Sequence, residues 1–152
     1  MSNNDKKEIM FKEIDLIQSC ITRMAQNSFI VKGWLVTLIT VVLTLLPEKI
    51  DFGLLCITCA ISILCFWFLD AFFLKTEKLY RMKYEWIIKN RMNSDAHMFD
   101  LNPYNSEMWI KKKGKNENFK APSLISVMVS KTLLPMYMLL LGIVAFVFIV
   151  KL

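Results

Sequence analysis

Apolar side chains recur through the first third of the chain at alternating steps of four and three residues. This spacing places them on one side of a helix and is the a/d pattern of a helix that packs against partners along its length. We therefore predict one long helix from Asp5 to Leu46, in which only Ser28 breaks the apolar line. The line consists of Met10, Ile14, Ile17, Ile21, Met24, Ser28, Val31, Leu35, Leu38, Val42 and Leu45.

Small and polar residues form a second line almost opposite the first: Ser19, Thr22, Gln26, Gly33, Thr37, Thr40 and Thr44. One interpretation is helix packing, because threonine bonds its own backbone carbonyls and small residues let helices approach closely. The other is that several copies of the helix surround a polar conduit. The candidate pore-lining residues are then Gly33, Thr37, Thr40 and Thr44, assisted by Thr58 and Ser62 of the next apolar segment.

Three apolar segments are about as long as the ~20 residues that cross a bilayer. They are residues 29–46, 53–73 and 132–150, and the short connection from Pro47 to Phe52 predicts that the first two form an antiparallel hairpin. More than half of the residues are hydrophobic although the net charge is +6, so charge must be separated from the apolar segments. We predict an all-α integral membrane protein with three transmembrane helices and long cytosolic helical extensions.

The distribution of basic residues predicts the orientation. Seventeen of the 19 Lys and Arg residues precede the first segment, lie near its start or lie between the second and third segments, and only Lys49 and Lys151 fall on the other side. By the positive-inside rule the N-terminus is cytosolic and the C-terminus periplasmic. Residues 1–7 lack the features of a signal peptide, so no targeting segment is expected to be removed.

The cytosolic part is predicted to be a helical stalk formed by residues 1–28 and 74–131. The second apolar segment continues without Gly or Pro to Met92, with favourable Glu77–Arg81 and Glu85–Lys89 spacing. Phe72, Leu79, Met82 and Trp86 give this extension an apolar side. Turn residues follow, Ser106 is a candidate cap of a short helix, and a last helix is expected from Leu124 to Val150, loosened or bent at Pro135.

The densest positive charge lies at Lys111, Lys112, Lys113, Lys115 and Lys120, near the aromatic residues Tyr104 and Trp109. Two interpretations stay open. The lysines can be a topology signal that contacts anionic lipid. Alternatively, clustered ammonium groups and aromatic faces can bind a phosphate-bearing ligand such as single-stranded nucleic acid.

Lys32 and Asp70 lie at the predicted inner ends of the first two spans, where ionisable side chains are costly and are usually paired or functional. They are predicted either to form a salt bridge with each other or to line the inner mouth of a pore.

Residues that could perform catalysis are sparse. His97 is the single histidine, it falls in a turn-like segment, and solvation or packing explains it. Cys20, Cys56, Cys59 and Cys65 lie on predicted helices and suit packing better than a disulfide or zinc site. Phosphate-binding, dinucleotide-binding and hydrolase motifs are absent from the sequence. We therefore expect neither an enzyme nor a bound metal or cofactor.

Four stretches carry a resemblance: RMAQNSFIVKGW at 23–34, FWFLDAFFLKTEKLYR at 66–81, FDLNPY at 99–104 and SKTLLPMY at 130–137. They resemble small three-span bacterial membrane proteins of anti-phage defence, most closely the membrane effectors of Hailong-type defence. The resemblance implies an oligomeric inner-membrane channel, controlled by a DNA oligomer that a partner nucleotidyltransferase makes, whose opening depolarises the infected cell. It does not imply whether the oligomer opens or closes the channel.

These expectations combine into a homo-oligomer, a tetramer, that forms a ligand-gated pore and harms the host cell when it opens. The alternative is a non-conducting membrane scaffold that recruits a cytosolic partner through its helical stalk. A weaker alternative is an accessory subunit of a larger transporter.

Overall fold

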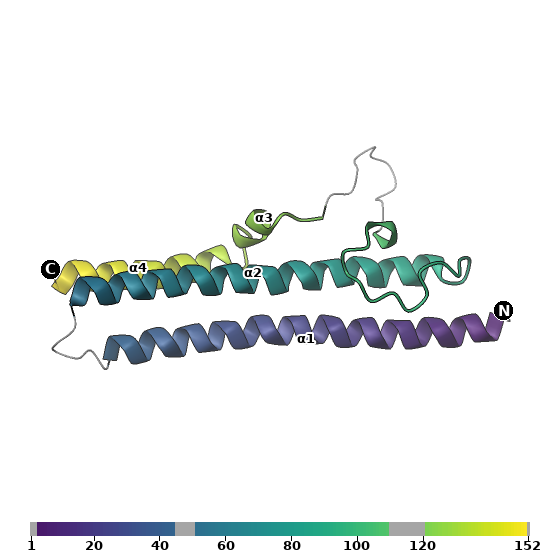
Figure 1. Cartoon of the computed structure of the whole chain (residues 1–152), viewed down its shortest axis with the longest axis horizontal. Helices are drawn as coiled ribbons and strands as arrows, with labels where there is room; N and C mark the ends of the chain where they lie inside the picture. Colours follow the sequence, from purple (N-terminus) through teal and green to yellow (C-terminus); the bar gives the residue numbers. More distant parts are fainter. Residues whose placement is uncertain (1–2, 45–50, 110–120, 152) are drawn as a thin grey trace. The chain divides into compact units, whose positions relative to one another are not determined.

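The computed structural model describes residues 3–44, 51–109 and 121–151, and the regular elements in these ranges are all helical. They are α1 (Asn3–Thr44), α2 (Phe52–Asn90), the 3-10 helix η1 (Ser106–Met108), α3 (Leu124–Met128) and α4 (Leu134–Lys151) (Figure 1). The all-α class is thus confirmed. The predicted turn at 47–52 falls largely outside the described residues.

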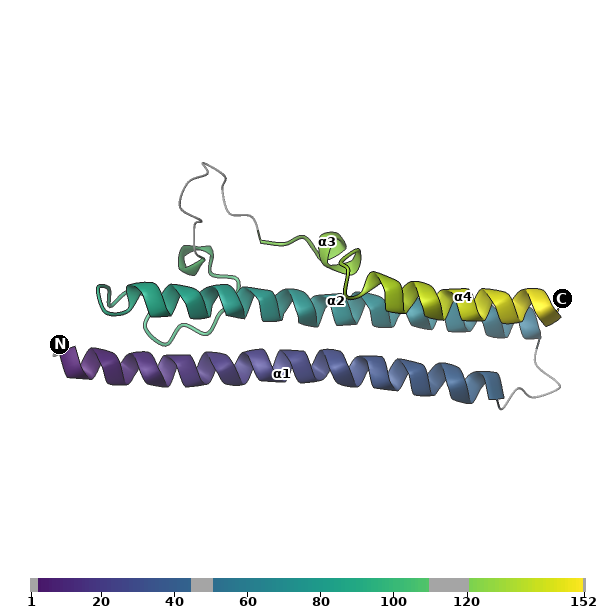
Figure 2. The ribbon, with the colours of Figure 1, turned by 180° about the vertical axis from the view of Figure 1, so that it is seen from behind.

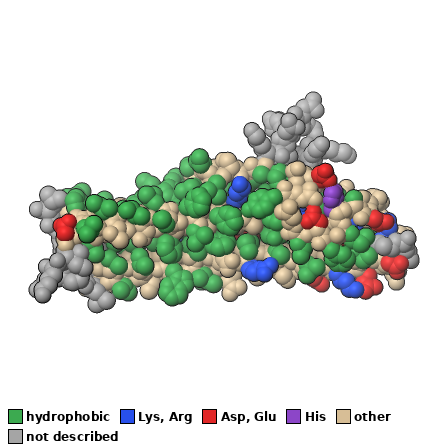
Figure 3. All heavy atoms as spheres, in the orientation of Figure 1, with side chains coloured by type: hydrophobic (Ala, Val, Ile, Leu, Met, Phe, Trp, Pro, Cys, Tyr) green, Lys and Arg blue, Asp and Glu red, His purple; other side chains and the backbone are tan. Residues whose placement is uncertain are grey.

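The chain forms two compact units, and α1 and α2 each contribute to both. Unit 1 consists of Met1–Gln26 and Leu74–Pro122, and unit 2 of Asn27–Phe73 and Ser123–Leu152. Their boundaries on α1 and α2 lie close to the ends of the apolar segments expected at Phe29 and Phe73. In Figure 3 hydrophobic side chains cover most of the visible face of unit 2, whereas most acidic and basic side chains in view belong to unit 1.

Two helices in the described residues, α1 and α2, are long and apolar enough to cross a membrane. The helix α4 is more apolar than α1 and α2, but its apolar part, Leu134–Val150, is shorter than these two helices. The third span therefore stays a prediction.

The buried side of α1 follows an 11-residue repeat instead of the predicted seven-residue one. Ile17, Ser28 and Ile39 are 11 residues apart and all buried, whereas Leu38 is 40% exposed. At about 100° per residue, seven residues fall about 20° short of two turns and 11 residues pass three turns by about 20°, so the drift per residue is smaller for the 11-residue repeat. The predicted apolar line is therefore wrong at Leu38, where Ile39 takes its place. Leu45 lies outside the described residues.

In unit 2, α4 packs alongside the first half of α2, as Figures 1 and 2 both show. Trp67 of α2 stacks on Tyr137 of α4 with ring centroids 5.5 Å apart, and Phe52 stacks on Phe148 at 6.3 Å. The buried side chains of these two helices include Cys56, Cys59, Ile63, Leu140 and Val144.

The segment after Pro122 forms two helices, so the predicted single helix from Leu124 to Val150 is wrong. Ser123 caps α3 by accepting a hydrogen bond from the Ser126 backbone N–H at 3.1 Å. The helix ends at Met128, and α4 begins only at Leu134. Pro135 explains the late start, because proline fits the first turn of a helix but breaks its interior.

In unit 1 the first half of α1 packs on the second half of α2 around Ile17, Ile87 and Met108. Of the apolar side predicted for α2, Leu79 is buried, Met82 and Trp86 are half-buried, and Phe72, which belongs to unit 2, is exposed. The two pairs predicted on α2 both form: Glu77–Arg81 at 2.8 Å, with Glu77 buried, and Glu85–Lys89 at 3.7 Å, with both side chains exposed.

The short helix predicted near Ser106 is present as η1, but its cap differs. The side chain of Asn105, not that of Ser106, accepts the hydrogen bond from the Glu107 backbone N–H at 3.1 Å. An asparagine with an extended backbone is as good an N-cap as serine.

Candidate functional site

The polar face of α1 is exposed throughout. Each of its predicted members, from Ser19 to Thr44, is exposed. The hydroxyls of Thr40 and Thr44 donate to the backbone carbonyls of Val36 and Thr40 at 2.8 and 2.9 Å. Threonine on a helix commonly satisfies its hydroxyl in this way, so the face is stable without a partner.

Two hydroxyls of α2 behave in the same way. Thr58 donates to the carbonyl of Leu54, and Ser62 donates to that of Thr58, both at 2.9 Å. Thr58 is exposed and Ser62 is half-buried.

Gly33 lies in the middle of the polar face of α1, and within the part of the chain that the structure describes no neighbour requires a glycine there. A Cβ built on Gly33 meets no atom within 4 Å. Glycine inside a helix costs about 1 kcal/mol relative to alanine. Gly33 therefore lowers helix stability without improving packing among the described residues. This favours a close approach by another copy of the chain or by another molecule.

Asp70 is the centre of a buried polar cluster in unit 2. Its side chain is fully buried, and Lys32 pairs with its Oδ2 at 2.7 Å. Ser28 donates its hydroxyl to Oδ1, and the Tyr137 hydroxyl donates to Oδ2 at 2.9 Å. The cluster therefore joins α1, α2 and α4 through one carboxylate.

This arrangement corresponds to the salt-bridge alternative for Lys32 and Asp70. The Asp70 carboxylate is enclosed and does not line an open surface of the chain, whereas the Lys32 side chain is 27% exposed. Lys32 also contacts the Ser28 hydroxyl at 2.6 Å. A buried carboxylate in an apolar unit is costly unless it is paired and hydrogen-bonded, and here it is both.

Sequence reasoning missed Ser28 and Tyr137 as members of this cluster. A signal for Ser28 existed, since it is the polar break in the apolar line and lies one helical turn before Lys32. Tyr137 gave no comparable signal, because one tyrosine in an apolar segment is ordinary at a membrane interface.

Unit 1 contains a second buried acid–base pair, Glu13 of α1 with Arg91 just after α2. Arg91 Nη2 donates to Glu13 Oε1 at 2.8 Å, and Nε donates to Oε2. Its remaining N–H groups donate to the carbonyls of Ser94, Ala96 and His97 at 3.1, 2.7 and 3.2 Å. All five guanidinium donors are thus used.

The loop after α2 closes around this pair. Glu13 Oε1 also accepts the Phe99 backbone N–H at 2.7 Å, and His97 and Phe99 both adopt φ of 54°. A left-handed conformation is strained for residues other than glycine, so these contacts hold the loop in a shape it would not adopt alone.

Asp100 fixes the next part of the loop. It accepts hydrogen bonds from the Asn102 backbone N–H at 2.7 Å and from Asn105 Nδ2 at 2.6 Å, and Lys83 Nζ lies 3.2 Å away. Burial alone would raise the pKa of Asp100, but these bonds together lower it below its usual value. Burial lowers the pKa of Lys83 even though Asp100 opposes that shift.

His97 is packed, as expected from its setting. Its Nε2 lies 2.9 Å from Glu107 Oε2, and its ring meets Trp86 edge-on at 6.1 Å. Within the described ranges, no group of three or more His, Cys, Asp or Glu side chains could hold a metal ion. The four cysteines are free thiols.

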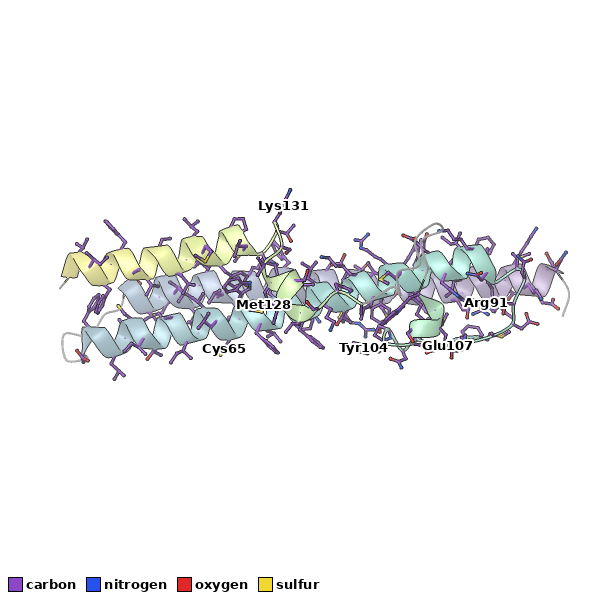
Figure 4. All side chains as sticks on the ribbon, turned by 90° about the horizontal axis from the view of Figure 1, so that it is seen from above. Cys65, Arg91, Tyr104, Glu107, Met128 and Lys131 are labelled. Carbon is purple, nitrogen blue, oxygen red and sulfur yellow. The ribbon has the colours of Figure 1, made fainter. Side chains whose placement is uncertain are left out.

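The residues predicted to bind an anionic ligand are only partly described. Tyr104 is half exposed, and the Trp109 indole N–H donates to the Pro103 carbonyl at 3.1 Å. Figure 4 places Tyr104 and Glu107 on the segment beside α2, and Arg91 near the end of that helix. Lys111, Lys112, Lys113, Lys115 and Lys120 lie outside the described residues.

Comparison with known proteins identifies no relative. The chain matches no family model, no curated protein and no solved structure. A function can therefore be inferred only from the residues of this chain.

Proposed function

We propose that the chain assembles as a homotetramer in the bacterial inner membrane and acts as a channel effector of anti-phage defence. An anionic nucleotide or DNA oligomer controls the channel, and its opening depolarises the cell and arrests growth. One observation carries the proposal: the exposed face of α1 is lined by glycine and threonine inside a helix long enough to cross a membrane.

The character of this face supports a pore shared between copies. Hydroxyls that are satisfied by their own helix can still accept hydrogen bonds from water, so a ring of them suits a hydrated path. The small side chain of Gly33 leaves space on the same side. A lipid-facing surface gains nothing from these residues, whereas apolar side chains cover the flanks of the helix, among them Trp34, Val36 and Val41.

Unit 1 supplies the proposed sensor. The basic segment follows η1, whose Met108 is buried in the core of unit 1. Phosphate groups would bind the lysines, and the exposed ring of Tyr104 offers a face for a base. Because α1 and α2 run through both units, a ligand that biases the packing in unit 1 acts on the same helices that line the pore.

Membrane potential in growing cells tests the proposal. Cells expressing the wild-type chain, alone and with a neighbouring nucleotidyltransferase gene, are compared with Thr37→Leu/Thr40→Leu cells using a voltage-sensitive dye. Val41→Leu is the matched control, since Val41 is exposed on the same helix but off the polar face. We expect depolarisation by wild type and control, modulated by the partner gene and absent from the double variant. Equal potentials in all strains, with or without phage, would favour the scaffold.

The sensor is tested separately from the pore. Replacing Lys111, Lys112, Lys113 and Lys115 by Gln should remove control by the partner gene and leave the conducting ability intact. Lys7→Gln/Lys12→Gln is the control for reduced positive charge. If control by the partner gene survives the four substitutions, the basic segment is a topology signal and the ligand binds elsewhere.

A further inference from the structure

The polar face of α1 has one apolar interruption. Gln26 and Gly33 are seven residues apart, and the exposed residues between them on this side of the helix are Phe29 and Ile30. At 100° per residue, Phe29 lies about 40° to one side of Gly33 and Ile30 about 60° to the other. Two large apolar side chains thus fill the gap from both sides.

Phe29 makes little contact with its own chain. It is 77% exposed, the largest exposed fraction among the large hydrophobic side chains that the structure describes. The single chain therefore leaves this large apolar side chain open to contact with lipid or with another copy of the chain. In an oligomer whose α1 helices face one axis, the same side chain from each copy would meet near that axis.

The other side of this helical turn is anchored. Ser28 and Lys32 flank Phe29 in sequence and both bond Asp70 of α2, which also accepts the Tyr137 hydroxyl of α4. The backbone that carries Phe29 is therefore fixed to two other helices by the buried cluster. Rotation of this turn requires that the cluster rearranges.

We propose that Phe29, flanked by Ile30, is the hydrophobic constriction of the pore, and that the Asp70 cluster positions it. A narrow ring of apolar side chains excludes water and thereby ions, so the pore conducts only when the ring widens. The inference rests on the proposed function and adds its gate. In this arrangement Phe29 separates the polar positions up to Gln26 from those beginning at Gly33.

Accessibility of introduced cysteines tests the gate without requiring a known ligand. A charged, membrane-impermeant methanethiosulfonate is added outside spheroplasts expressing Thr40→Cys or Gln26→Cys, and labelling is counted above that of the unsubstituted chain. Each is examined with wild-type Phe29, with Phe29→Ser and with Trp34→Ala. Trp34 is a matched control, because this aromatic residue is 66% exposed on α1 but off the polar face.

We expect Thr40→Cys to react in each background. In the condition, with or without the partner gene, in which cells expressing the wild-type chain keep their membrane potential, Gln26→Cys should be protected with wild-type Phe29 and with Trp34→Ala. It should react roughly tenfold faster or more with Phe29→Ser, because loss of the apolar ring lets water through. If Gln26→Cys reacts equally fast with Phe29 and with Phe29→Ser, or becomes reactive with Trp34→Ala, Phe29 is not the gate. This result would leave the proposed pore unaffected. If Thr40→Cys is itself unreactive, the pore is refuted and the gate with it.

Phe29→Leu and Phe29→Trp provide a second test with the same labelling of Gln26→Cys. Both keep a large apolar side chain and should keep Gln26→Cys protected, whereas Phe29→Ala should resemble Phe29→Ser. If Gln26→Cys reacts as fast with Phe29→Leu as with Phe29→Ser, shape and not apolar bulk matters at this position. This result would overturn the hydrophobic constriction.

Discussion

In the described residues, each unit has a buried acid–base pair that joins α1 to α2 or to the residue just after α2, and the two pairs differ in how completely they are enclosed. In unit 1 the Arg91 and Glu13 side chains are 0% and 2% exposed, and in unit 2 Asp70 is fully buried whereas Lys32 is 27% exposed. Arg91 uses all its donors on Glu13 and three backbone carbonyls, and Lys32 relies on Asp70 and Ser28.

The two pairs differ in how easily they can rearrange. Arginine is a planar group of fixed geometry, and its full set of bonds makes the pair in unit 1 a permanent support for the loop. Lysine is a single charge on a flexible stem that can reach the headgroup region from the end of a span. The pair in unit 2 can therefore change partners at lower cost, as the positioning of a gate requires.

Removal of Glu13 should cause the largest loss. Glu13→Ala leaves the Arg91 guanidinium buried without a counter-charge, which typically costs about 3 to 5 kcal/mol. We expect a lower unfolding midpoint in detergent, and faster hydrogen exchange in residues 3–26 and 74–109. An exchange increase restricted to unit 2 would contradict the role assigned to this pair.

Asp70→Asn should cost less than Glu13→Ala. Asparagine can still accept a hydrogen bond from one of the Ser28 and Tyr137 hydroxyls and donate its amide N–H to the other, and Lys32 can turn toward water. We therefore expect a loss of about 1 to 3 kcal/mol. A double-mutant cycle with Lys32→Met measures the coupling. If Asp70→Asn destabilises the protein more than Glu13→Ala, the pair in unit 2 is the more rigid one and the comparison is reversed.

Asp100 is expected to make the stability of unit 1 depend on pH. Because its pKa in the folded protein is lowered, it contributes stability above the pKa of the unfolded chain, about 4, that is lost as the pH falls through the folded value. Asp100→Asn should lower the free energy of unfolding by about 1 kcal/mol at neutral pH. Between about pH 5 and 3, the free energy of unfolding of the variant should fall less steeply than that of wild type. Wild type and variant with parallel acid profiles would exclude this contribution. Asp15→Asn is the control, because Asp15 is an exposed carboxylate of α1 in the same unit.

The exposed pair Glu85–Lys89 should contribute least to stability. The side chains of Glu85 and Lys89 are 60% and 59% exposed at a separation of 3.7 Å. Glu85→Ala should change the unfolding free energy by less than about 0.5 kcal/mol, and added salt should reduce even this effect. A loss as large as that of Asp70→Asn would mean that burial does not explain the ranking.

The sequence predicted the helices well because their signals are local. Apolar length, charge spacing and the absence of Gly and Pro from Asp70 to Met92 predicted α1 and α2. Leu38 was misplaced because a seven-residue repeat drifts on an α-helix. Pro135 signalled a disturbance but not a complete break, since its effect depends on the turn that precedes it.

The buried pairs were harder to predict, because they join residues far apart in the sequence. Lys32 and Asp70 were visible as charges within apolar segments, whereas Glu13 and Arg91 looked like ordinary surface charges among many. Only the fold, which brings residues 78 positions apart into contact, distinguishes this pair from the exposed ones.

Conductance of the purified chain in a planar lipid bilayer tests the central claim, a pore lined by the polar face of α1, most directly. Recordings are made with and without a mixed-sequence single-stranded DNA oligomer on either side. We predict discrete current steps for the wild-type chain, modulated by the oligomer, that are unchanged in Val41→Leu and strongly reduced in Thr40→Leu. Steps of equal size in Thr40→Leu, or none for wild type under any condition, would contradict the account.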